Sequence, residues 1–125
     1  MTDVLLVDDS MFMRLFYRRI LEDHGIQIAG EAANGYEAIA QYQEYRPDIV
    51  ILDINMPGIS GIITLQELMR IDSSACIMMA SAMGQEIFVQ QSITFGAKAF
   101  IVKPISKRVL IKSIQHLVMQ YPSRK

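Results

Sequence analysis

Three carboxylates follow directly after two short apolar runs of the chain. The run Val4–Val7 ends in Asp8 and Asp9, and the run Ile49–Leu52 ends in Asp53. Apolar runs of this length that end in charge are typical of strands buried on both faces of a parallel sheet. Open α/β sheets bind their ligands at the carboxyl ends of the strands. Because three carboxylates at one edge repel one another, we expect a divalent cation to hold them together.

Other polar side chains follow apolar runs in the same way. Asn55 stands in the loop after the second run. Ser81 follows the run Ile77–Ala80, and Lys103 follows the run Ala99–Val102. The carboxyl ends of parallel strands share one edge, so this edge would combine acids suited to a hard metal with a hydroxyl and an ammonium group.

Five apolar runs alternate with amphipathic stretches over the whole chain, which predicts one α/β domain over residues 1–125. The expected strands are Val4–Val7, Ile26–Ala29, Ile49–Leu52, Ile77–Ala80 and Ala99–Val102. The expected helices are Met11–His24, Tyr36–Tyr45, Ile62–Ile71, Gln85–Phe95 and a fifth that begins near Ser106. Right-handed crossovers would place helices on both faces of the sheet. We expect the tail after Met119 to be frayed.

Composition and charge exclude several classes of protein. The chain has 125 residues, 51% of them hydrophobic, and 12 basic and 13 acidic residues give a net charge of −1. Without a basic excess, nucleic acid is not an expected ligand. No apolar stretch is long enough to span a bilayer, and the first residues lack the positive region of a signal peptide. The single cysteine, Cys76, has no partner for an internal disulfide, so we expect a soluble cytoplasmic protein.

Each candidate residue also has a simpler explanation. Asp8 and Asp9 could cap the first helix, although one acid suffices for a cap. Asp53 could be a solvated acid at a strand end. Ser81 could be a turn hydroxyl, and the Lys103 side chain could extend from its strand into water. Only their occurrence together favours a common site.

Four segments together resemble the receiver domain of two-component response regulators. They are Val7-Asp8-Asp9-Ser10, Leu52-Asp53-Ile54-Asn55-Met56-Pro57, Ser81-Ala82 and Val102-Lys103-Pro104. Each is weak alone, but their order on successive strand ends is specific, and the likeness covers essentially the whole chain. It is greatest to the single-domain regulators of chemotaxis. The resemblance implies a flavodoxin-like (βα)5 fold, a doubly wound five-stranded parallel sheet with strand order 2-1-3-4-5.

The resemblance also implies the chemistry. Asp53 would attack the phosphorus of a phosphohistidine and become an acyl phosphate. Asp8, Asp9, Asp53 and the backbone carbonyl of Asn55 would hold Mg²⁺, which offsets the repulsion between the two anions. Lys103, before a cis peptide bond to proline, would bind a phosphoryl oxygen. Such a phosphoacceptor assists its own phosphorylation and dephosphorylation but is not an enzyme.

A switch follows from the same resemblance. Ser81 would donate a hydrogen bond to a phosphoryl oxygen after transfer, and Phe100 would turn from solvent into the space vacated. The surface of the fourth helix, fifth strand and fifth helix would then change shape and bind a partner. Candidate contacts on this output face are Ile87, Phe88, Gln91, Phe100, Ile105, Arg108 and Lys112.

The expected partners are a histidine kinase of the CheA type as donor and the flagellar motor switch protein as target, with a phosphatase as a third. The segment Ser81-Ala82-Met83-Gly84-Gln85 resembles chemotaxis regulators of Gram-positive bacteria. Two alternatives stay open: a phosphorelay intermediate that passes phosphate to a phosphotransfer protein, and the receiver domain of a transcription factor. Neither nucleic acid nor a membrane is an expected partner.

Two other classes of protein share parts of the pattern. A phosphatase of the haloacid-dehalogenase type also uses a strand-end Asp and Mg²⁺, but it needs an acid two residues later, where this chain has Asn55. A flavodoxin-like protein that binds a nucleotide or flavin needs a phosphate-binding loop after the first strand. Asp8 and Asp9 would repel a phosphate there.

The chain departs from the common pattern of the family at a few positions. Ser60 replaces a frequent Asp, which puts the geometry of that loop in question, and Ser81 replaces the commoner threonine. Met83 occupies one of two positions that flank the attacking water during hydrolysis. Because a thioether is a weak acceptor, we predict a long-lived phosphate on Asp53 unless a phosphatase assists.

Overall fold

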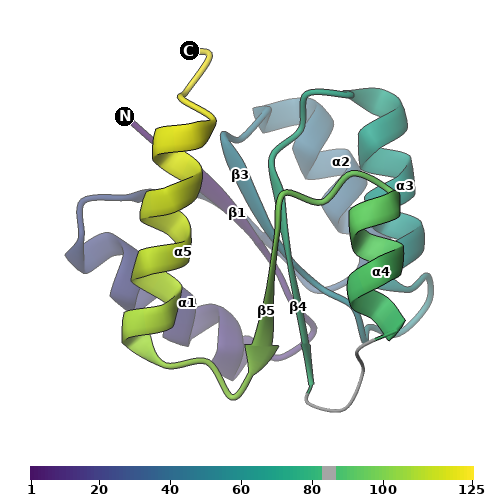
Figure 1. Cartoon of the computed structure of the whole chain (residues 1–125), viewed down its shortest axis with the longest axis horizontal. Helices are drawn as coiled ribbons and strands as arrows, with labels where there is room; N and C mark the ends of the chain where they lie inside the picture. The colour runs from purple at the N-terminus through teal and green to yellow at the C-terminus, as the bar shows by residue number, and fades with distance from the viewer. Residues whose placement is uncertain (83–86) are drawn as a thin grey trace.

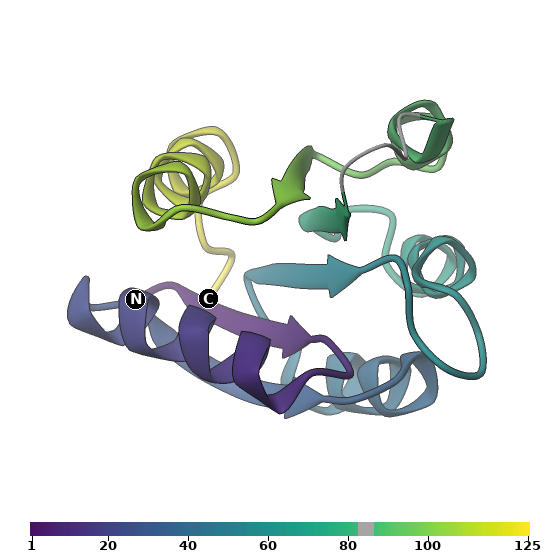
Figure 2. The same cartoon turned by 90° about the horizontal axis from the view of Figure 1, so that it is seen from below.

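The protein forms a five-stranded parallel sheet between two layers of helices, as its computed structural model shows (Figures 1 and 2). The structure describes residues 1–82 and 87–125. The strands are β1 (Asp3–Val7), β2 (Gln27–Ala32), β3 (Ile49–Asp53), β4 (Ile77–Ala82) and β5 (Ala99–Lys103). The helices are α1 (Met11–Asp23), α2 (Gly35–Tyr45), α3 (Gly61–Ile71), α4 (Ile87–Thr94) and α5 (Lys107–Gln120). The strand order β2-β1-β3-β4-β5 confirms the predicted topology.

Two hydrophobic clusters lie on opposite faces of the sheet, which explains why its central strands are apolar throughout. Leu6 of β1 and Ile51 of β3 pack under α1 and α5, whereas Leu5 and Leu52 pack under α2 and α3. All four side chains are fully buried. Figure 2 shows this arrangement, with α1 and α5 on one side of the sheet and α2, α3 and α4 on the other. An apolar run that ends in a charged residue therefore does mark a strand that is covered on both faces.

Helices α1, α2, α3 and α5 begin at side-chain caps, and the helices end close to the predicted residues. The hydroxyl of Ser10, rather than a carboxylate of Asp9, accepts a hydrogen bond from the N–H of Met13 and caps α1. Asn34, Ser60 and Ser106 cap α2, α3 and α5 in the same way. Of the predicted fourth helix, Gln85 lies outside the described residues.

Within the described ranges, no helix combines the length and the apolar character that a bilayer span requires.

Strand β2 extends three residues beyond the predicted end at Ala29. Gly30 and Glu31 interrupt the apolar run, but both belong to this edge strand, which is half-buried over most of its length. A Cβ atom at position 30 would lie 2.4 Å from the side-chain oxygen of Gln41, so α2 crosses the strand where there is no side chain. The prediction ended this strand too early because Gly30 and Glu31 are not apolar, although both belong to the strand and α2 packs against it at Gly30.

The prediction of a frayed tail was wrong, because three polar residues attach the tail to the amino edge of the sheet. The hydroxyl of Ser123 donates to Asp48 at 2.8 Å. Arg124 pairs with Asp72 at 2.8 Å, and Lys125 pairs with Asp3 at 2.6 Å. These contacts come from positions far away in the chain, and an apolar pattern does not reveal them.

Candidate functional site

The three predicted acids meet at the carboxyl edge of the sheet. Asp8 follows β1, Asp53 ends β3, and one carboxylate oxygen from each of Asp8, Asp9 and Asp53 lies within 4.8 Å of the others. Asp8 and Asp53 are 1% and 4% exposed, whereas Asp9 is open to solvent. Oxygen ligands this close together, one of them open to water, fit a hard divalent cation that keeps part of its hydration shell.

Lys103 brings a positive charge to these acids from the end of β5. Its ammonium nitrogen lies 2.8 Å from Oδ2 of Asp8 and 3.4 Å from Oδ1 of Asp53. The peptide bond between Lys103 and Pro104 is cis, as the family resemblance suggested. Burial works to lower the pKa of Lys103, but the contacts with Asp8 and Asp53 outweigh it and raise that pKa, so the side chain stays charged.

The surroundings of Asp53 disfavour its ionised form. Burial, followed by repulsion from Asp8, raises the pKa of Asp53 to about 6. Lys103 and a hydrogen bond from the backbone N–H of Asn55 act in the opposite direction. A carboxylate in this setting is a better nucleophile than a well-solvated one, and it is still ionised at neutral pH.

Glycine and a helix cap shape the loop that follows Asp53. A Cβ atom at Gly61 would lie 2.2 Å from the carbonyl oxygen of Asp53, so α3 begins in contact with the end of β3. The N–H of Gly61 donates to the carbonyl of Ile54 at 2.8 Å. Ser60, where relatives often carry Asp, caps α3 through the N–H of Ile63. The serine therefore closes this loop by an ordinary helix cap.

The predicted switch residues lie on neighbouring strands. Ser81 is fully buried in β4 and stands opposite Val102 of β5. Phe100 is half-buried, packs against the cluster under α2 and α3, and borders a hollow of about 170 Å³ beside Ser92 of α4. The sequence prediction placed Phe100 in solvent; its ring is already partly inside. Met83 lies outside the described residues.

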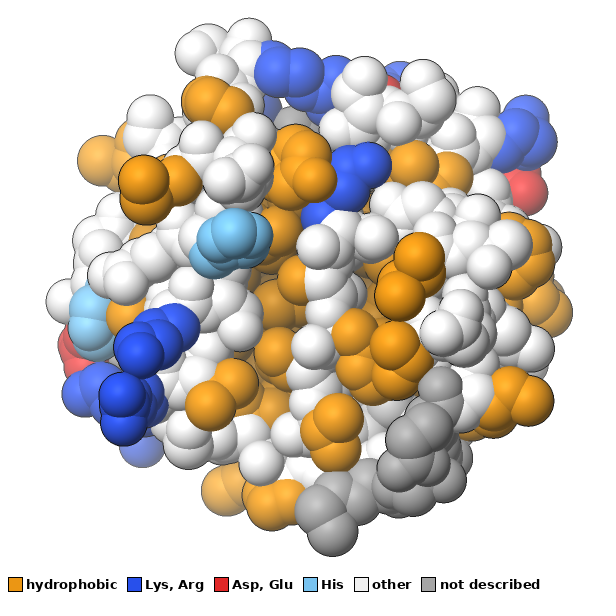
Figure 3. Space-filling view, in the orientation of Figure 1, with side chains coloured by type: hydrophobic (Ala, Val, Ile, Leu, Met, Phe, Trp, Pro, Cys, Tyr) orange, Lys and Arg blue, Asp and Glu red, His pale blue; other side chains and the backbone are white. Residues whose placement is uncertain are grey.

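Not all predicted contacts of the output face lie on that face. Ile105 is buried, and Arg108 and Lys112 line a hollow with His24, on the side of α5 that faces α1. Figure 3 shows basic side chains gathered over the beginning of α5. Ile87, Phe88 and Gln91 of α4 are exposed or half-buried, so they stay available as contacts on the predicted face.

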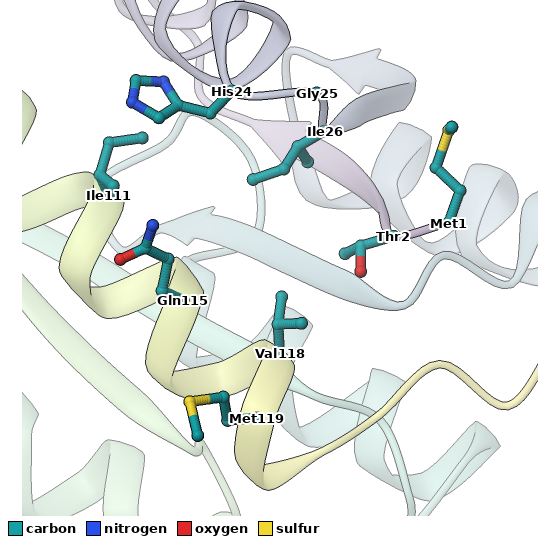
Figure 4. A pocket seen from close by; sticks show the side chains of 9 residues that line it. All are labelled: Met1, Thr2, His24, Gly25, Ile26, Ile111, Gln115, Val118 and Met119. Carbon is teal, nitrogen blue, oxygen red and sulfur yellow. The ribbon is translucent and has the colours of Figure 1, made fainter.

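A separate pocket of about 520 Å³ lies between α5 and the segment that follows α1 (Figure 4). Apolar side chains from both elements line it, among them Ile26, Ile111 and Val118. None of the predicted site residues takes part, so this pocket is distinct from the acidic edge.

Sequence reasoning missed two residues next to the acids, Arg14 and Tyr17, and the acid that holds Arg14 in place. Arg14 donates a hydrogen bond to the carbonyl oxygen of Asp8 and is paired with Glu31 of β2. The hydroxyl of Tyr17 of α1 is buried and has no hydrogen-bond partner in the described part of the chain. Burial, and then the charges of Asp8 and Asp53, raise the pKa of Tyr17. No local pattern marks these residues, because their partners are distant in the sequence.

Known proteins resemble this chain over most of its length. The family model of the response regulator receiver domain matches residues 4–115. Chemotaxis protein CheY of Thermotoga maritima is 46% identical over 111 residues, which are 89% of this chain and 92% of that protein. Chemotaxis protein CheY of Bacillus subtilis is 44% identical with the same coverage. A crystal structure of a CheX–CheY–BeF3–Mg²⁺ complex from Borrelia burgdorferi matches with a TM-score of 0.87 and 37% identity, covering 98% of this chain and 90% of that one.

Proposed function

This chain belongs to the response regulator receiver domain family, and from that premise we propose that it accepts a phosphoryl group on Asp53 from a histidine kinase, with Mg²⁺, and then binds a partner protein. The observation that carries the proposal is the meeting of Asp8, Asp9 and Asp53 within 4.8 Å, beside the ammonium group of Lys103. A buried acid whose negative charge is compensated by Lys103 on one side and by a bound cation on the other can attack an anionic phosphoryl group.

The acidic edge fits Mg²⁺ better than it fits a softer metal, since every side chain offers oxygen. Asp8, Asp9 and Asp53 would hold the ion together with the backbone carbonyl of Asn55. When bound, Mg²⁺ supplies positive charge that offsets the repulsion between the carboxylate and the phosphoryl group.

Asp53 performs the covalent step. A carboxylate oxygen of Asp53 forms a bond to phosphorus as the bond from phosphorus to the histidine nitrogen breaks. The electron pair of the broken bond stays on the imidazole, which takes a proton from solvent. Lys103 lies near enough to Asp53 to bind an oxygen of the transferred group, and its ammonium group fits a phosphoryl oxygen as a compact charge.

Ser81 and Phe100 would transmit the change. The hydroxyl of Ser81 is placed at the end of β4, one residue beyond the partner of Asp53 in the sheet register. A hydrogen bond from this hydroxyl to the phosphoryl group would draw the end of β4 toward the site. Phe100 would then move further inward, and the face of α4, β5 and α5 would change shape.

Chemotaxis is the output that the relatives favour. Since two curated relatives are chemotaxis proteins, we propose a CheA-like kinase as donor and the flagellar motor switch as target. The relative crystallised with CheX and Mg²⁺ supports a further protein partner, which we propose to be a phosphatase. With these partners, the protein would act in the cytoplasm. A phosphotransfer protein as target, and the receiver part of a transcription factor, are the alternatives.

Phosphotransfer with a small donor tests the proposal. The chain is incubated with acetyl phosphate and Mg²⁺, and mass spectrometry follows the addition of one phosphoryl group. We expect the label on the native protein and none on Asp53→Ala, whereas Asp23→Ala, which changes an exposed acid at the end of α1, keeps it. Labelling that persists in Asp53→Ala would contradict the proposal, and turnover of a phosphomonoester would favour the phosphatase alternative.

A further inference from the structure

Arg14 of α1 connects the acidic edge to the outer strand of the sheet. Its Nη1 donates a hydrogen bond to the carbonyl oxygen of Asp8 at 2.6 Å, and its Nε donates to Oε1 of Glu31 at 2.8 Å. The Arg14 side chain is only 16% exposed. One guanidinium group therefore holds the backbone beside two of the proposed metal ligands and is itself held from β2.

Glu31 is a fixed anchor rather than a mobile surface acid. Its second carboxylate oxygen accepts from Arg18 Nε at 2.9 Å, and its carbonyl accepts from Gln41 Nε2 at 2.7 Å. In the sheet register it stands beside Leu6 of β1. Partial burial works to raise the pKa of Glu31, but Arg18 and Arg14 outweigh it and lower that pKa, so the anchor stays charged at neutral pH.

The contact with Asp8 acts through the backbone. The carbonyl of Asp8 belongs to the planar peptide that joins Asp8 to Asp9. Holding that oxygen fixes the plane, and with it the directions in which both side chains leave the chain. The carboxylate of Asp8 is fixed again by the N–H of Ser10, which donates to Oδ1 at 2.9 Å.

We propose that Arg14, anchored by Glu31, is a positioning residue that presents Asp8 and Asp9 to the metal ion. This inference rests on the proposed function, since it concerns the same Mg²⁺ site. Arg14 contacts neither the carboxylate of Asp53 nor that of Asp9 among the recorded hydrogen bonds and ion pairs of the described residues. Its two contacts need the fork of an arginine, because the single ammonium group of a lysine lacks that planar geometry.

Arg18 offers a matched control. It has the same side chain, lies one turn further along α1 and pairs with the same Glu31, and also with the exposed Glu22 at 3.2 Å. Among the described residues, no hydrogen bond or ion pair joins it to Asp8. Arg14→Gln and Arg18→Gln therefore each remove one positive charge and an ion pair with Glu31. Only Arg14→Gln also removes the donor to the Asp8 carbonyl.

Titration with Mg²⁺ separates a role in positioning Asp8 from a general effect on charge or stability. Calorimetry measures the Kd for Mg²⁺, and thermal unfolding without Mg²⁺ measures the stability of each variant. We expect Arg14→Gln to raise the Kd roughly 10-fold or more, as is usual for a residue that orients a metal ligand, and Arg14→Lys to recover only part of the loss. Arg18→Gln is expected to change the Kd less than about twofold, because it leaves that ligand-orienting contact in place.

Equal Kd values for Arg14→Gln and the native protein would overturn the inference. Equal weakening by both glutamine variants would overturn it too, because loss of charge or of helix stability would then explain the effect. Failure of the proposed function looks different: the native protein itself would not bind Mg²⁺ and would not be labelled on Asp53.

Discussion

The ammonium group of Lys103 lies closer to Asp8 than to Asp53, at 2.8 Å against 3.4 Å. One positive charge thus compensates two buried carboxylates that face each other across β1 and β3. A cation bound at Asp8 would take over part of this compensation. Lys103 would then be free to bind an oxygen of a group attached to Asp53, so the resting ion pair and the proposed catalytic contact use the same side chain.

Replacing Lys103 should slow phosphorylation strongly. Without the ammonium group, the phosphoryl oxygens lose the side-chain cation that lies 3.4 Å from Asp53. We expect Lys103→Met to lower the rate of labelling by acetyl phosphate by about 10². Lys112→Met, which removes an exposed lysine on α5, should leave the rate unchanged. A Lys103→Met rate within twofold of native would contradict a role for this residue.

The pH dependence of phosphorylation should report Asp53. Its pKa is raised to about 6, and only the ionised carboxylate attacks phosphorus. That value applies without metal, and bound Mg²⁺ would favour the ionised carboxylate. At saturating Mg²⁺ the labelling rate should therefore stay constant to well below pH 6, and the inflection should move up toward about pH 6 as the Mg²⁺ concentration is lowered. Two small phosphodonors with different titrations are compared, so that the inflection common to both belongs to the protein. An inflection that does not move with the Mg²⁺ concentration would contradict the coupling between Asp53 and the ion.

The same shift has a consequence for stability. The pKa of Asp53 is about 6 in the folded protein against 3.8 for an ordinary Asp, so the folded state binds this proton more tightly. The free energy of unfolding therefore falls as the pH rises from about 4 to about 6, and this loss of stability is complete above that range. Without metal, Asp53→Asn should raise the free energy of unfolding at pH 7 by about 1 to 3 kcal/mol and have little effect at pH 4. Urea unfolding at both pH values measures this, and a variant that loses stability at pH 7 would contradict it.

Mg²⁺ should stabilise the folded protein through the acidic edge. At a concentration 100 times its Kd, the ion would add about 2.7 kcal/mol and raise the midpoint of thermal unfolding by about 5 to 10 °C. We expect Asp9→Asn to reduce this shift, because Asp9 offers an oxygen to the cluster, and a chelator to reverse it. Asp23→Asn should keep the full shift. Equal shifts in both variants would place the ion elsewhere.

The sequence predicted the sheet and its acidic edge because those features are local. A buried central strand is apolar at every position, and the charge that follows it lies at the strand end whatever the rest of the chain does. The family resemblance then supplied the strand order, which the alternation alone left open. Asp8, Asp53 and Lys103 lie together as expected, since each directly follows or ends a strand.

The features that escaped prediction all depend on distant partners. Arg14 is an ordinary polar position of a helix until Glu31 and the carbonyl of Asp8 are placed beside it. The tail residue Lys125 forms an ion pair with Asp3 at the other end of the chain. Such pairs carry no periodicity, so only the folded arrangement reveals them.

Met83→Glu should shorten the life of the phosphorylated form. The family resemblance implies that position 83 flanks the attacking water, from which a carboxylate would accept a hydrogen bond better than a thioether does. We expect the loss of phosphate to accelerate roughly tenfold or more, whereas Met83→Leu leaves it unchanged. Release of phosphate from purified, labelled protein measures the rate. No acceleration by glutamate would contradict the prediction that Met83 gives a long-lived phosphate.

Two buried tyrosines should respond in opposite directions to the loss of the hydroxyl. Tyr17 and Tyr42 are both fully buried, but only the hydroxyl of Tyr42 has a partner within the described residues, Asp72 at 2.8 Å. Tyr42→Phe leaves that acid without this donor and should cost about 1 to 2 kcal/mol. Tyr17→Phe removes a polar group that is buried without a partner and should be neutral or stabilise by up to about 1 kcal/mol.

Urea unfolding of the two variants measures the difference, with phenylalanine conserving the shape of both side chains. A large loss of stability in Tyr17→Phe would mean that its hydroxyl has a partner. Because Asp8 and Asp53 raise the pKa of Tyr17, the acidic edge would be the first place to search for that partner. Tyr17 would then be part of the site, which it would contact from the α1 side of the sheet.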